Sequence, residues 1–316
     1  MTAKYGAQLP QLGSTKLFLT EGGIETTLVF KKGVDLPDFS ALILLDTVGG
    51  KESLRECYAP YIEIAARLKT GIVLETPTWR GSSAWAEALA INDADISRLN
   101  REAVKFLQEL RDKYESPTTP VVISGNLGPL CDACKSSAGL SIDSARACYR
   151  TQVEALCEAG VDMLSTLTLN NTTEAIAAAQ LAKEKYMPIM VSFCVETNGL
   201  LLEGKSLAGA VTQVDKATGQ DVVYYGINCA HPFHFERVLR EMDQTVRQRL
   251  GDIRANASVK SHDELDNSDI LDRGDPEGLS ISYELLKALL PALKVVGGCC
   301  GTDEEHAARI GLKLIG

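Results

Sequence analysis

The sequence lacks any apolar run that approaches the ~20 residues needed to span a membrane. Its first residues, MTAKYGAQLPQLGST, also lack the apolar segment of a secretory leader. Positive charge is not in excess, because 32 lysines and arginines stand against 42 aspartates and glutamates, a net charge of −10. We therefore expect a cytoplasmic protein that binds neither membranes nor nucleic acid.

Other absences exclude further classes of protein. Nine cysteines in 316 residues are too sparse for a secreted disulfide scaffold, and an odd number leaves one unpaired. In a reducing compartment they should be thiols, buried apolar residues or metal ligands. The chain has no glycine-rich phosphate motif, internal repeat or low-complexity tail. These absences leave a globular protein whose chemistry depends on neither a disulfide scaffold nor a phosphate-binding motif.

Eight short runs rich in β-branched, aromatic or apolar residues recur along the chain, and nearly all end in polar residues, glycine or cysteine. The runs are Leu17–Gly23, Ile72–Thr78, Val121–Gly128, Asp162–Thr168, Pro188–Val195, Val222–Cys229, Asp252–Val259 and Val295–Cys300. Helical patterns separate many of them, at Leu54–Lys69, Ile96–Tyr114, Ser144–Ala159, Thr173–Tyr186, His234–Leu250 and Ser282–Leu290. This alternation predicts an α/β protein, a (β/α)₈ TIM barrel formed by residues 1–316 as one domain. A doubly wound open sheet is the alternative, but it does not require all eight ends to converge.

The least regular stretch is Lys260–Gly278, KSHDELDNSDILDRGDPEG. It is acidic and has no apolar period, so we expect a polar loop insertion at about 260–278, between the seventh and eighth units. Such a loop is either a solvated cover or a lid over a site at the strand ends.

The adjacent cysteines Cys299 and Cys300 end the last strand run. In a continuing strand they would point to opposite faces, but the flanking glycines allow the backbone to turn and aim both sulfurs at one point. A disulfide between them is disfavoured, because neighbouring Cα atoms are ~3.8 Å apart. The pair alone fits either a metal site or two inert buried thiols.

The position of Cys229 favours a metal site over two inert buried thiols. It ends the sixth run, and in a barrel the sixth and eighth strands have their ends close together. Three thiolates with one vacant position form an open tetrahedral site that suits Zn²⁺, because soft ligands disfavour magnesium, calcium and manganese. A structural zinc site normally has four protein ligands, so a vacancy points to a catalytic role.

Other residues offer weaker candidates for metal or redox chemistry. His231 and His234 follow Cys229 and are more typical of solvated loop histidines. Cys131 and Cys134 form a C-x-x-C that fits a second metal or a redox pair less well than packing. The four cysteines in helix or strand-core patterns should be packing residues, namely Cys57, Cys148, Cys157 and Cys194. An aldolase-type barrel is disfavoured because no lysine stands out at a strand end.

Asn228-Cys229 together with Gly297-Gly298-Cys299-Cys300-Gly301 resembles the zinc-dependent homocysteine S-methyltransferase family. This family includes the S-methylmethionine- and betaine-dependent enzymes and the homocysteine half of methionine synthase. Two further motifs agree in order, Glu21-Gly22-Gly23 and Gly125-Asn126-Leu127-Gly128-Pro129. The likeness covers essentially the whole chain, and the cysteine motif is its most specific part.

The resemblance implies a (β/α)₈ barrel and a zinc held by Cys229, Cys299 and Cys300, with an incoming thiol as the fourth ligand. The thiol, deprotonated by zinc, attacks the methyl carbon of an onium donor, so no further catalytic residue is needed. The acceptor is then homocysteine, giving methionine, and the partners are this thiol and a methyl donor. The residues expected to bind substrate are Glu21, Gly22, Gly23, Thr76, Trp79, Asn126, Thr168 and Asn228, with Phe39 on the donor side.

The chain departs from the family pattern at two positions. Glu21 stands where members commonly have aspartate, and Leu167 stands where the family usually has a glutamate that holds the acceptor's ammonium group. Leucine cannot pair with an ammonium, so Glu21, Glu75 or Thr168 takes over, or the acceptor is another thiol. A divergent member that acts on or binds a different thiol, with or without methyl transfer, is therefore the alternative hypothesis.

The methyl donor and the oligomeric state are less constrained. The chain ends soon after GGCCGT and shows no folate- or corrinoid-binding modules, which favours a small onium donor resembling S-methylmethionine, S-adenosylmethionine or betaine. Trp79 and Phe39 could contact such a cation through their rings, although packing is the more ordinary role. The sequence leaves open whether the chain forms a homo-oligomer.

Overall fold

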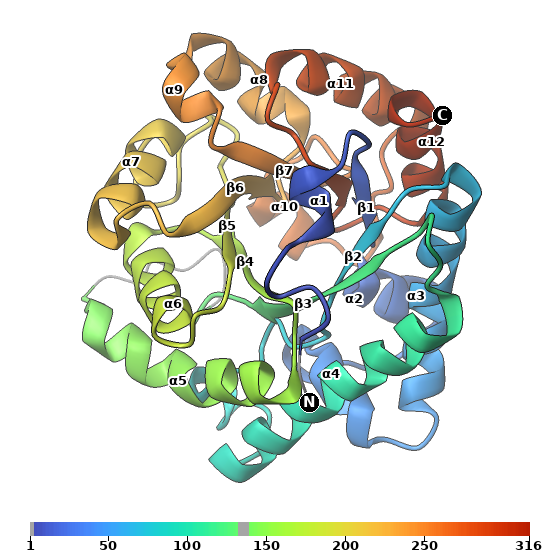
Figure 1. Ribbon diagram of the computed structural model, residues 1–316, viewed down its shortest axis with the longest axis vertical. Helices are drawn as coiled ribbons and strands as arrows, with labels where there is room; N and C mark the ends of the chain where they lie inside the picture. The colour runs from blue at the N-terminus through green and yellow to red at the C-terminus, as the bar shows by residue number, and fades with distance from the viewer. Residues whose placement is uncertain (1–2, 132–138) are drawn as a thin grey trace.

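The structure is a computed structural model that describes residues 3–131 and 139–316. Eight parallel strands form a closed barrel in which each strand pairs with its neighbours in chain order, and β8 pairs with β1 (Figure 1). The strands are β1 Phe18–Thr20, β2 Ile72–Glu75, β3 Val121–Leu127, β4 Met163–Leu169, β5 Ile189–Phe193, β6 Val222–Asn228, β7 Leu250–Ala255 and β8 Val295–Gly298. The predicted (β/α)₈ barrel is confirmed, and the open sheet is not formed.

Helices surround the barrel on its outside (Figure 1). The longer ones are α3 Gly50–Leu68, α4 Asp93–Tyr114, α5 Ile142–Ala159, α6 Thr172–Glu184, α7 Leu207–Thr218, α8 Pro232–Glu241, α11 Pro276–Leu289 and α12 Glu304–Leu314. Short helical segments are α1 Pro10–Gly13, α2 Ile24–Thr26, α9 Gln244–Arg247 and α10 His262–Asp266, with single turns at Thr27–Lys31, Pro37–Phe39, Ala41–Asp46 and Ser83–Trp85. Within the described residues, no helix combines the length and apolar character needed to cross a membrane.

Several predicted boundaries are wrong. The expected helix His234–Leu250 is broken, because Asp243 caps the separate helix α9 and Leu250 already belongs to β7. β7 therefore begins and ends earlier than the predicted run Asp252–Val259. Among the longer helices, α7 and α12 were not predicted. Helix α11, predicted as Ser282–Leu290, starts at Pro276 instead, with its N-cap at Asp275.

The inside of the barrel changes character from one end to the other. Near its N-terminal end lies an apolar layer that includes Val73 and Tyr224. Two residues further along β2, on the same face, stands the buried carboxylate of Glu75. Asn228, four residues beyond Tyr224 on β6, reaches the C-terminal end. The alternating strand geometry thus places polar side chains above an apolar floor.

The N-terminal segment closes the apolar end of the barrel. Helix α1 lies in front of this opening, at its centre in Figure 1. Leu9 packs into the apolar layer, and Gln11 is fully buried, with its amide nitrogen 3.4 Å from the hydroxyl oxygen of Tyr224 and 3.3 Å from the sulfur of Met163. This end is therefore plugged, and access to the interior is from the opposite end.

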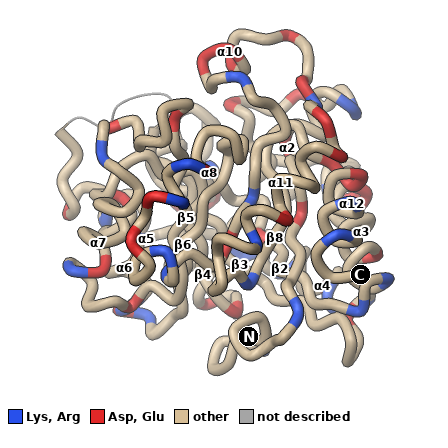
Figure 2. Tube along the Cα trace, turned by 90° about the horizontal axis from the view of Figure 1, so that it is seen from above, with Lys and Arg blue, Asp and Glu red and all other residues tan. Residues whose placement is uncertain are grey.

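The segment between β7 and α11 stands at that opposite end. Figure 2 shows α10 projecting there, on the far side of the molecule from the N-terminus, with several acidic residues along the tube. The stretch predicted as the loop Lys260–Gly278 contains the helix α10 and the first turn of α11, so it is not loop throughout.

Candidate active site

A cavity of about 630 Å³ opens at the C-terminal end of the strands. All residues that the sequence analysis assigned to metal, acceptor or donor line this one cavity, namely Glu21, Gly22, Gly23, Phe39, Thr76, Trp79, Asn126, Thr168, Asn228, Cys229, Cys299 and Cys300. Glu75 and Leu167 line it as well. The structure thus brings the candidates together, while the role of each remains a prediction.

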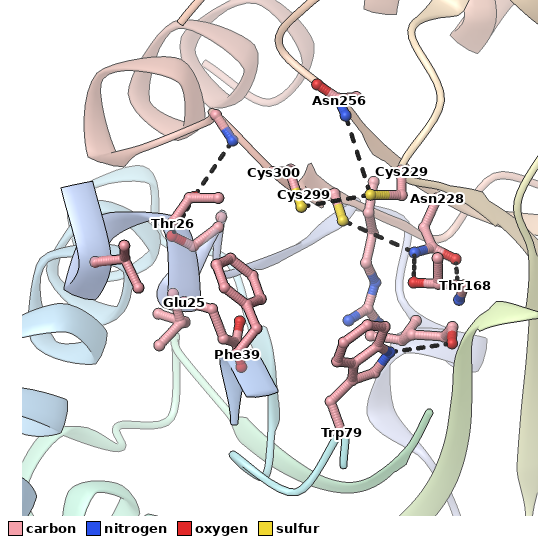
Figure 3. A pocket seen from close by; sticks show the side chains of 18 of the residues that line it. Glu25, Thr26, Phe39, Trp79, Thr168, Asn228, Cys229, Asn256, Cys299 and Cys300 are labelled. Carbon is pink, nitrogen blue, oxygen red and sulfur yellow. Dashed lines mark hydrogen bonds between the residues drawn. The ribbon is translucent and has the colours of Figure 1, made fainter. Parts of the chain in front are cut away.

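The three cysteines form a compact cluster at the ends of β6 and β8 (Figure 3). The sulfur atoms of Cys229, Cys299 and Cys300 all lie within 4.8 Å of one another, and those of Cys229 and Cys300 are 3.5 Å apart. Ligand sulfurs on a tetrahedral zinc with bonds of ~2.3 Å are about 3.8 Å apart. Among the described residues, this is the one group of three or more such side chains that could hold a metal ion, and its spacing fits a tetrahedral one.

Glycines allow the chain to turn at the paired cysteines. A Cβ on Gly298 would lie 2.0 Å from the hydroxyl oxygen of Thr302, so a side chain there would clash. Gly301 has a φ of +77°, in the left-handed region that favours glycine. The amide of Thr302 donates to the carbonyl of Cys299 at 3.1 Å and closes the turn that brings Cys300 toward Cys229.

The cluster favours a buried negative charge on one sulfur. Hydrogen bonds from the thiols of Cys229 and Cys300, and then from Asn228, hold the pKa of Cys299 well below its usual range. The same hydrogen bonding between thiols raises the pKa of Cys300 well above the usual range. A lowered thiol pKa favours the thiolate, which is the state required of a metal ligand.

Asn228 links the cysteine cluster to the end of β4. Its amide oxygen accepts from the backbone N–H of Thr168 at 2.8 Å and from the hydroxyl of Ser192 at 2.7 Å. Its amide nitrogen donates to the hydroxyl of Thr168 at 2.8 Å and lies 3.8 Å from the sulfur of Cys299. Asn228 therefore fixes the position of Thr168 relative to the cluster.

A buried ion cluster lies inside the barrel, below the cysteines. The guanidinium of Arg254, on β7, lies 2.8 Å from Glu75, 3.0 Å from Asp252 and 4.0 Å from Glu21. Burial raises the pKa of Glu21 to about 8; the charge of Arg254 opposes this rise, and the charge of Glu75 adds to it by less than Arg254 opposes it. Three carboxyl groups share one guanidinium, so the charge balance of the cluster allows a second cation to bind there.

Sequence reasoning missed Arg254, although a signal was present. An arginine inside an otherwise apolar run, DIRANASV, has to find buried anions if the run is a barrel strand. Closure of the barrel supplies them from β1 and β2. Sequence reasoning also missed other cavity-lining residues, namely Glu25, Arg80, Asn256 and His262.

Aromatic side chains form the outer wall of the cavity. Trp79 donates its indole N–H to the carbonyl of Leu167 at 3.3 Å, which aims the ring across the cavity. Phe39 faces it from the other side (Figure 3). Asp38 and Phe39 have φ values of +48° and +56°, an unfavourable conformation for residues with side chains. The chain thus presents Phe39 to the cavity on strained backbone.

The segment around α10 also walls the cavity, through Leu265, Ile270 and Leu271. His262 anchors it. The ring nitrogen Nε2 lies 2.7 Å from the carbonyl oxygen of Cys229 and 3.2 Å from the sulfur of Cys194, and Nδ1 lies 3.4 Å from Glu196. The segment therefore contacts both the cavity and the backbone of a cysteine in the cluster.

The weaker candidates lie elsewhere. His231 caps α8 through its own ring nitrogen and is outside the cysteine cluster. His234 contacts the carbonyl of Val259 at 2.9 Å. Cys131 is half-buried, and Cys134 lies outside the described residues, so the C-x-x-C pair cannot be assembled from the structure. Cys194, predicted to be a packing residue, is buried and also contacts His262.

Comparison with known proteins agrees with this geometry. The model of the homocysteine S-methyltransferase family matches residues 18–314. A homocysteine S-methyltransferase of Escherichia coli (strain K12) is 27% identical over 230 residues, covering 69% of this chain and 71% of its own. Homocysteine S-methyltransferase YbgG of Bacillus subtilis (strain 168) is 23% identical over 314 residues, covering 95% of each chain.

Solved structures show the same fold. Crystal structures of the homocysteine methyltransferase MmuM from E. coli superpose with a TM-score of 0.74 in both the oxidized and the metallated form. They are 21% and 22% identical, and each comparison covers 95% of this chain and 97% of MmuM. The resemblance seen in the cysteine and glycine motifs is confirmed, and the chain belongs to the homocysteine S-methyltransferase family.

Proposed function

We propose that this protein transfers a methyl group from a small onium donor to homocysteine, with Cys229, Cys299 and Cys300 as the ligands of a zinc ion. The observation that carries the proposal is the cluster of three thiols in the wall of the cavity, with sulfur spacings that suit a tetrahedral metal. Family membership supports methyl transfer to homocysteine. The metallated form of MmuM supports a metal, and the all-sulfur ligand set favours zinc.

Zinc, when bound, stabilises a thiolate at neutral pH, so the acceptor sulfur is deprotonated without a strong base. The acceptor's thiolate attacks the methyl carbon of the donor, and a sulfur–carbon bond forms. The bond from this carbon to the onium atom breaks, and the leaving group departs as a neutral sulfide or amine with the bonding electrons. No general acid is needed, and His262, the histidine that lines the described cavity, is engaged with the carbonyl of Cys229 and the carboxylate of Glu196.

The ion cluster is the part of the cavity that suits the ammonium group of an amino-acid thiol. Leu167 cannot bind it, as the sequence indicated. Glu21 is 6% exposed, and its carboxylate is 3.3–3.4 Å from the backbone N–H of Glu75 and 4.0 Å from Arg254, so its contacts are long. The ammonium group of a bound acceptor would supply a positive charge close to the carboxylate of Glu21. We therefore assign acceptor recognition to Glu21 with Glu75, in place of the position held by Leu167.

The alternative function is binding of another thiol, and Leu167 is the observation that favours it. A screen of thiol acceptors against onium donors, with zinc-loaded protein, separates the two hypotheses. Methionine formed from homocysteine supports the proposed function. If a different thiol binds and homocysteine does not, the acceptor assignment is wrong. The oligomeric state and the cytoplasmic location remain proposals.

The zinc site is tested by replacing one cysteine in the cluster and one outside it. Cys299→Ser should abolish both stoichiometric zinc, measured by mass spectrometry, and methyl transfer. Cys148→Ser changes a half-buried cysteine on α5 that does not line the cavity, and should retain both. Full methyl transfer by metal-free protein would contradict the proposal.

A further inference from the structure

Glu25 is a carboxylate in the cavity that the proposed function does not use. It lies on α2, two residues after Gly23, and is half-buried against the cavity. Helix α2 is pressed against the cysteine turn, because a Cβ on Gly23 would lie 2.8 Å from the carbonyl oxygen of Cys299. The hydroxyl of Thr26 accepts from the backbone N–H of Gly301 at 3.3 Å. These contacts fix Glu25 relative to the cluster.

The carboxylate of Glu25 feels the charge of Arg80 but has no closely paired cation among the described residues. Among the described residues, no side chain donates a hydrogen bond to it or forms an ion pair with it. Burial raises the pKa of Glu25 to about 7, and the nearby Cys299 adds to the rise. Arg80 opposes this effect from a distance, but its guanidinium is stacked 5.0 Å from the Trp79 ring and 3.9 Å from the Trp85 ring. An anion in this position is stabilised by a cation that enters from solution.

Aromatic rings surround the space in front of this carboxylate. In Figure 3, Glu25 lies beside Phe39, with Trp79 on the other side of the cavity and the cysteines beyond them. Phe39 and Trp79 are among the aromatic residues that line the cavity, and the faces of such rings attract cations. The strained backbone at Phe39 shows that the fold maintains this ring position at a cost of about 1–3 kcal/mol.

We propose that Glu25 is the counter-ion of the donor's onium group, which it holds between the rings of Phe39 and Trp79, and that it selects cationic methyl donors. This inference rests on the proposed function. The acceptor's ammonium has its own anions in Glu21 and Glu75, inside the barrel. Glu25 instead lies beside the aromatic wall, where a sulfonium or quaternary ammonium would be held by charge and by ring faces together.

The charge change during methyl transfer gives this assignment a kinetic signature. The donor is a cation when it binds, and its leaving group is neutral after the methyl carbon has bonded to the acceptor sulfur. Glu25 therefore stabilises the bound donor more than the transition state, in which the positive charge is already reduced. Glu25→Gln should raise KM for the donor about tenfold and leave kcat unchanged or higher.

Binding measurements test the assignment without requiring turnover. Two pairs of probes differ in the positive charge of the onium group, S-methylmethionine against methionine and glycine betaine against 3,3-dimethylbutanoate. Calorimetric titration of wild-type protein should show a preference for the charged member of at least one pair. Glu25→Gln should reduce this preference about tenfold, and Glu25→Asp, which keeps the charge, should reduce it less. Homocysteine affinity should stay the same in both variants.

Glu304→Gln is the matched control, because it removes an exposed carboxylate at the start of α12 that does not line the cavity. It should leave the preference intact. The assignment is overturned if wild-type protein does not prefer either charged probe, if Glu25→Gln keeps the preference, or if Glu25→Gln weakens homocysteine binding instead. If wild-type protein shows a preference that depends on Glu25 but forms no methionine, the proposed function fails and the binding role of Glu25 stands.

Discussion

Three residues of the cavity wall hold their backbone in the left-handed region although none is glycine. Phe39, Thr168 and Cys229 have φ values of +56°, +64° and +58°. For Thr168, whose side chain is β-branched, this conformation is a clear outlier. Its two hydrogen bonds with Asn228 offset the strain. Part of the backbone strain in the described residues therefore lies at residues that shape the site.

The buried charges below the cysteines show how much the fold depends on single residues. Arg254 is 2% exposed and is the cation shared by Glu75, Asp252 and Glu21. Burial raises the pKa of Asp252 to about 6 despite the opposing effect of Arg254. A carboxyl group with a raised pKa in the folded state favours folding at low pH, and this advantage is lost as the pH rises through that pKa.

Arg254→Met should therefore destabilise the protein in a pH-dependent way. Removing the guanidinium leaves the carboxylates uncompensated, at a cost of about 3–5 kcal/mol at neutral pH. Protonation relieves part of that cost, so the deficit relative to wild type should be smaller at pH 5 than at pH 8. Urea unfolding at the two pH values measures it, with the exposed Arg98→Met as control. A deficit that does not change with pH would contradict the account.

Among the elements, the segment carrying α10 is the one that covers the cavity. His262 is its link to the barrel, through the carbonyl of Cys229, the sulfur of Cys194 and the carboxylate of Glu196. Asp263 and Glu264 on the other face of α10 are exposed, so we expect His262 to contribute much of what holds this short helix in place.

His262→Ala should therefore release α10 without unfolding the barrel. Hydrogen–deuterium exchange of the amides in His262–Asp266 should become about tenfold faster, because the lost polar contacts amount to about 1–3 kcal/mol. The exposed Asp269→Ala in the same segment should leave the exchange rate unchanged. Equal rates in His262→Ala and wild type would show that other contacts hold the segment.

The barrel and the cysteine cluster could be predicted from the sequence because both follow from local patterns. Alternating strand and helix patterns imply a parallel sheet, and cysteines at strand ends meet when the sheet closes. The roles of Arg254 and Glu25 depend on which distant residues surround them, so no local pattern reveals them. The broken helix at Asp243 was missed because residues 234–250 read as one amphipathic stretch.

At the scale of the whole molecule, the barrel has a plugged end and an active end. Leu9, which is 3% exposed, fills the apolar layer at the plugged end. Leu9→Ala should lower the free energy of unfolding by about 2–5 kcal/mol, measured by urea unfolding, because it leaves a cavity in the core. Leu12→Ala, at a 41% exposed position, should cost less than about 0.5 kcal/mol. Zinc content should be unaffected in both variants, and a loss of zinc in Leu9→Ala would show that the two ends are coupled.

The central claim is that the three cysteines leave one zinc position for the sulfur of the acceptor. X-ray absorption at the zinc edge, with and without homocysteine, tests it most directly because it counts the sulfur ligands. The account predicts three sulfurs at ~2.3 Å in the protein alone and four when homocysteine is added. Fewer than three sulfurs in the protein alone, or a count that does not change with homocysteine, would contradict it.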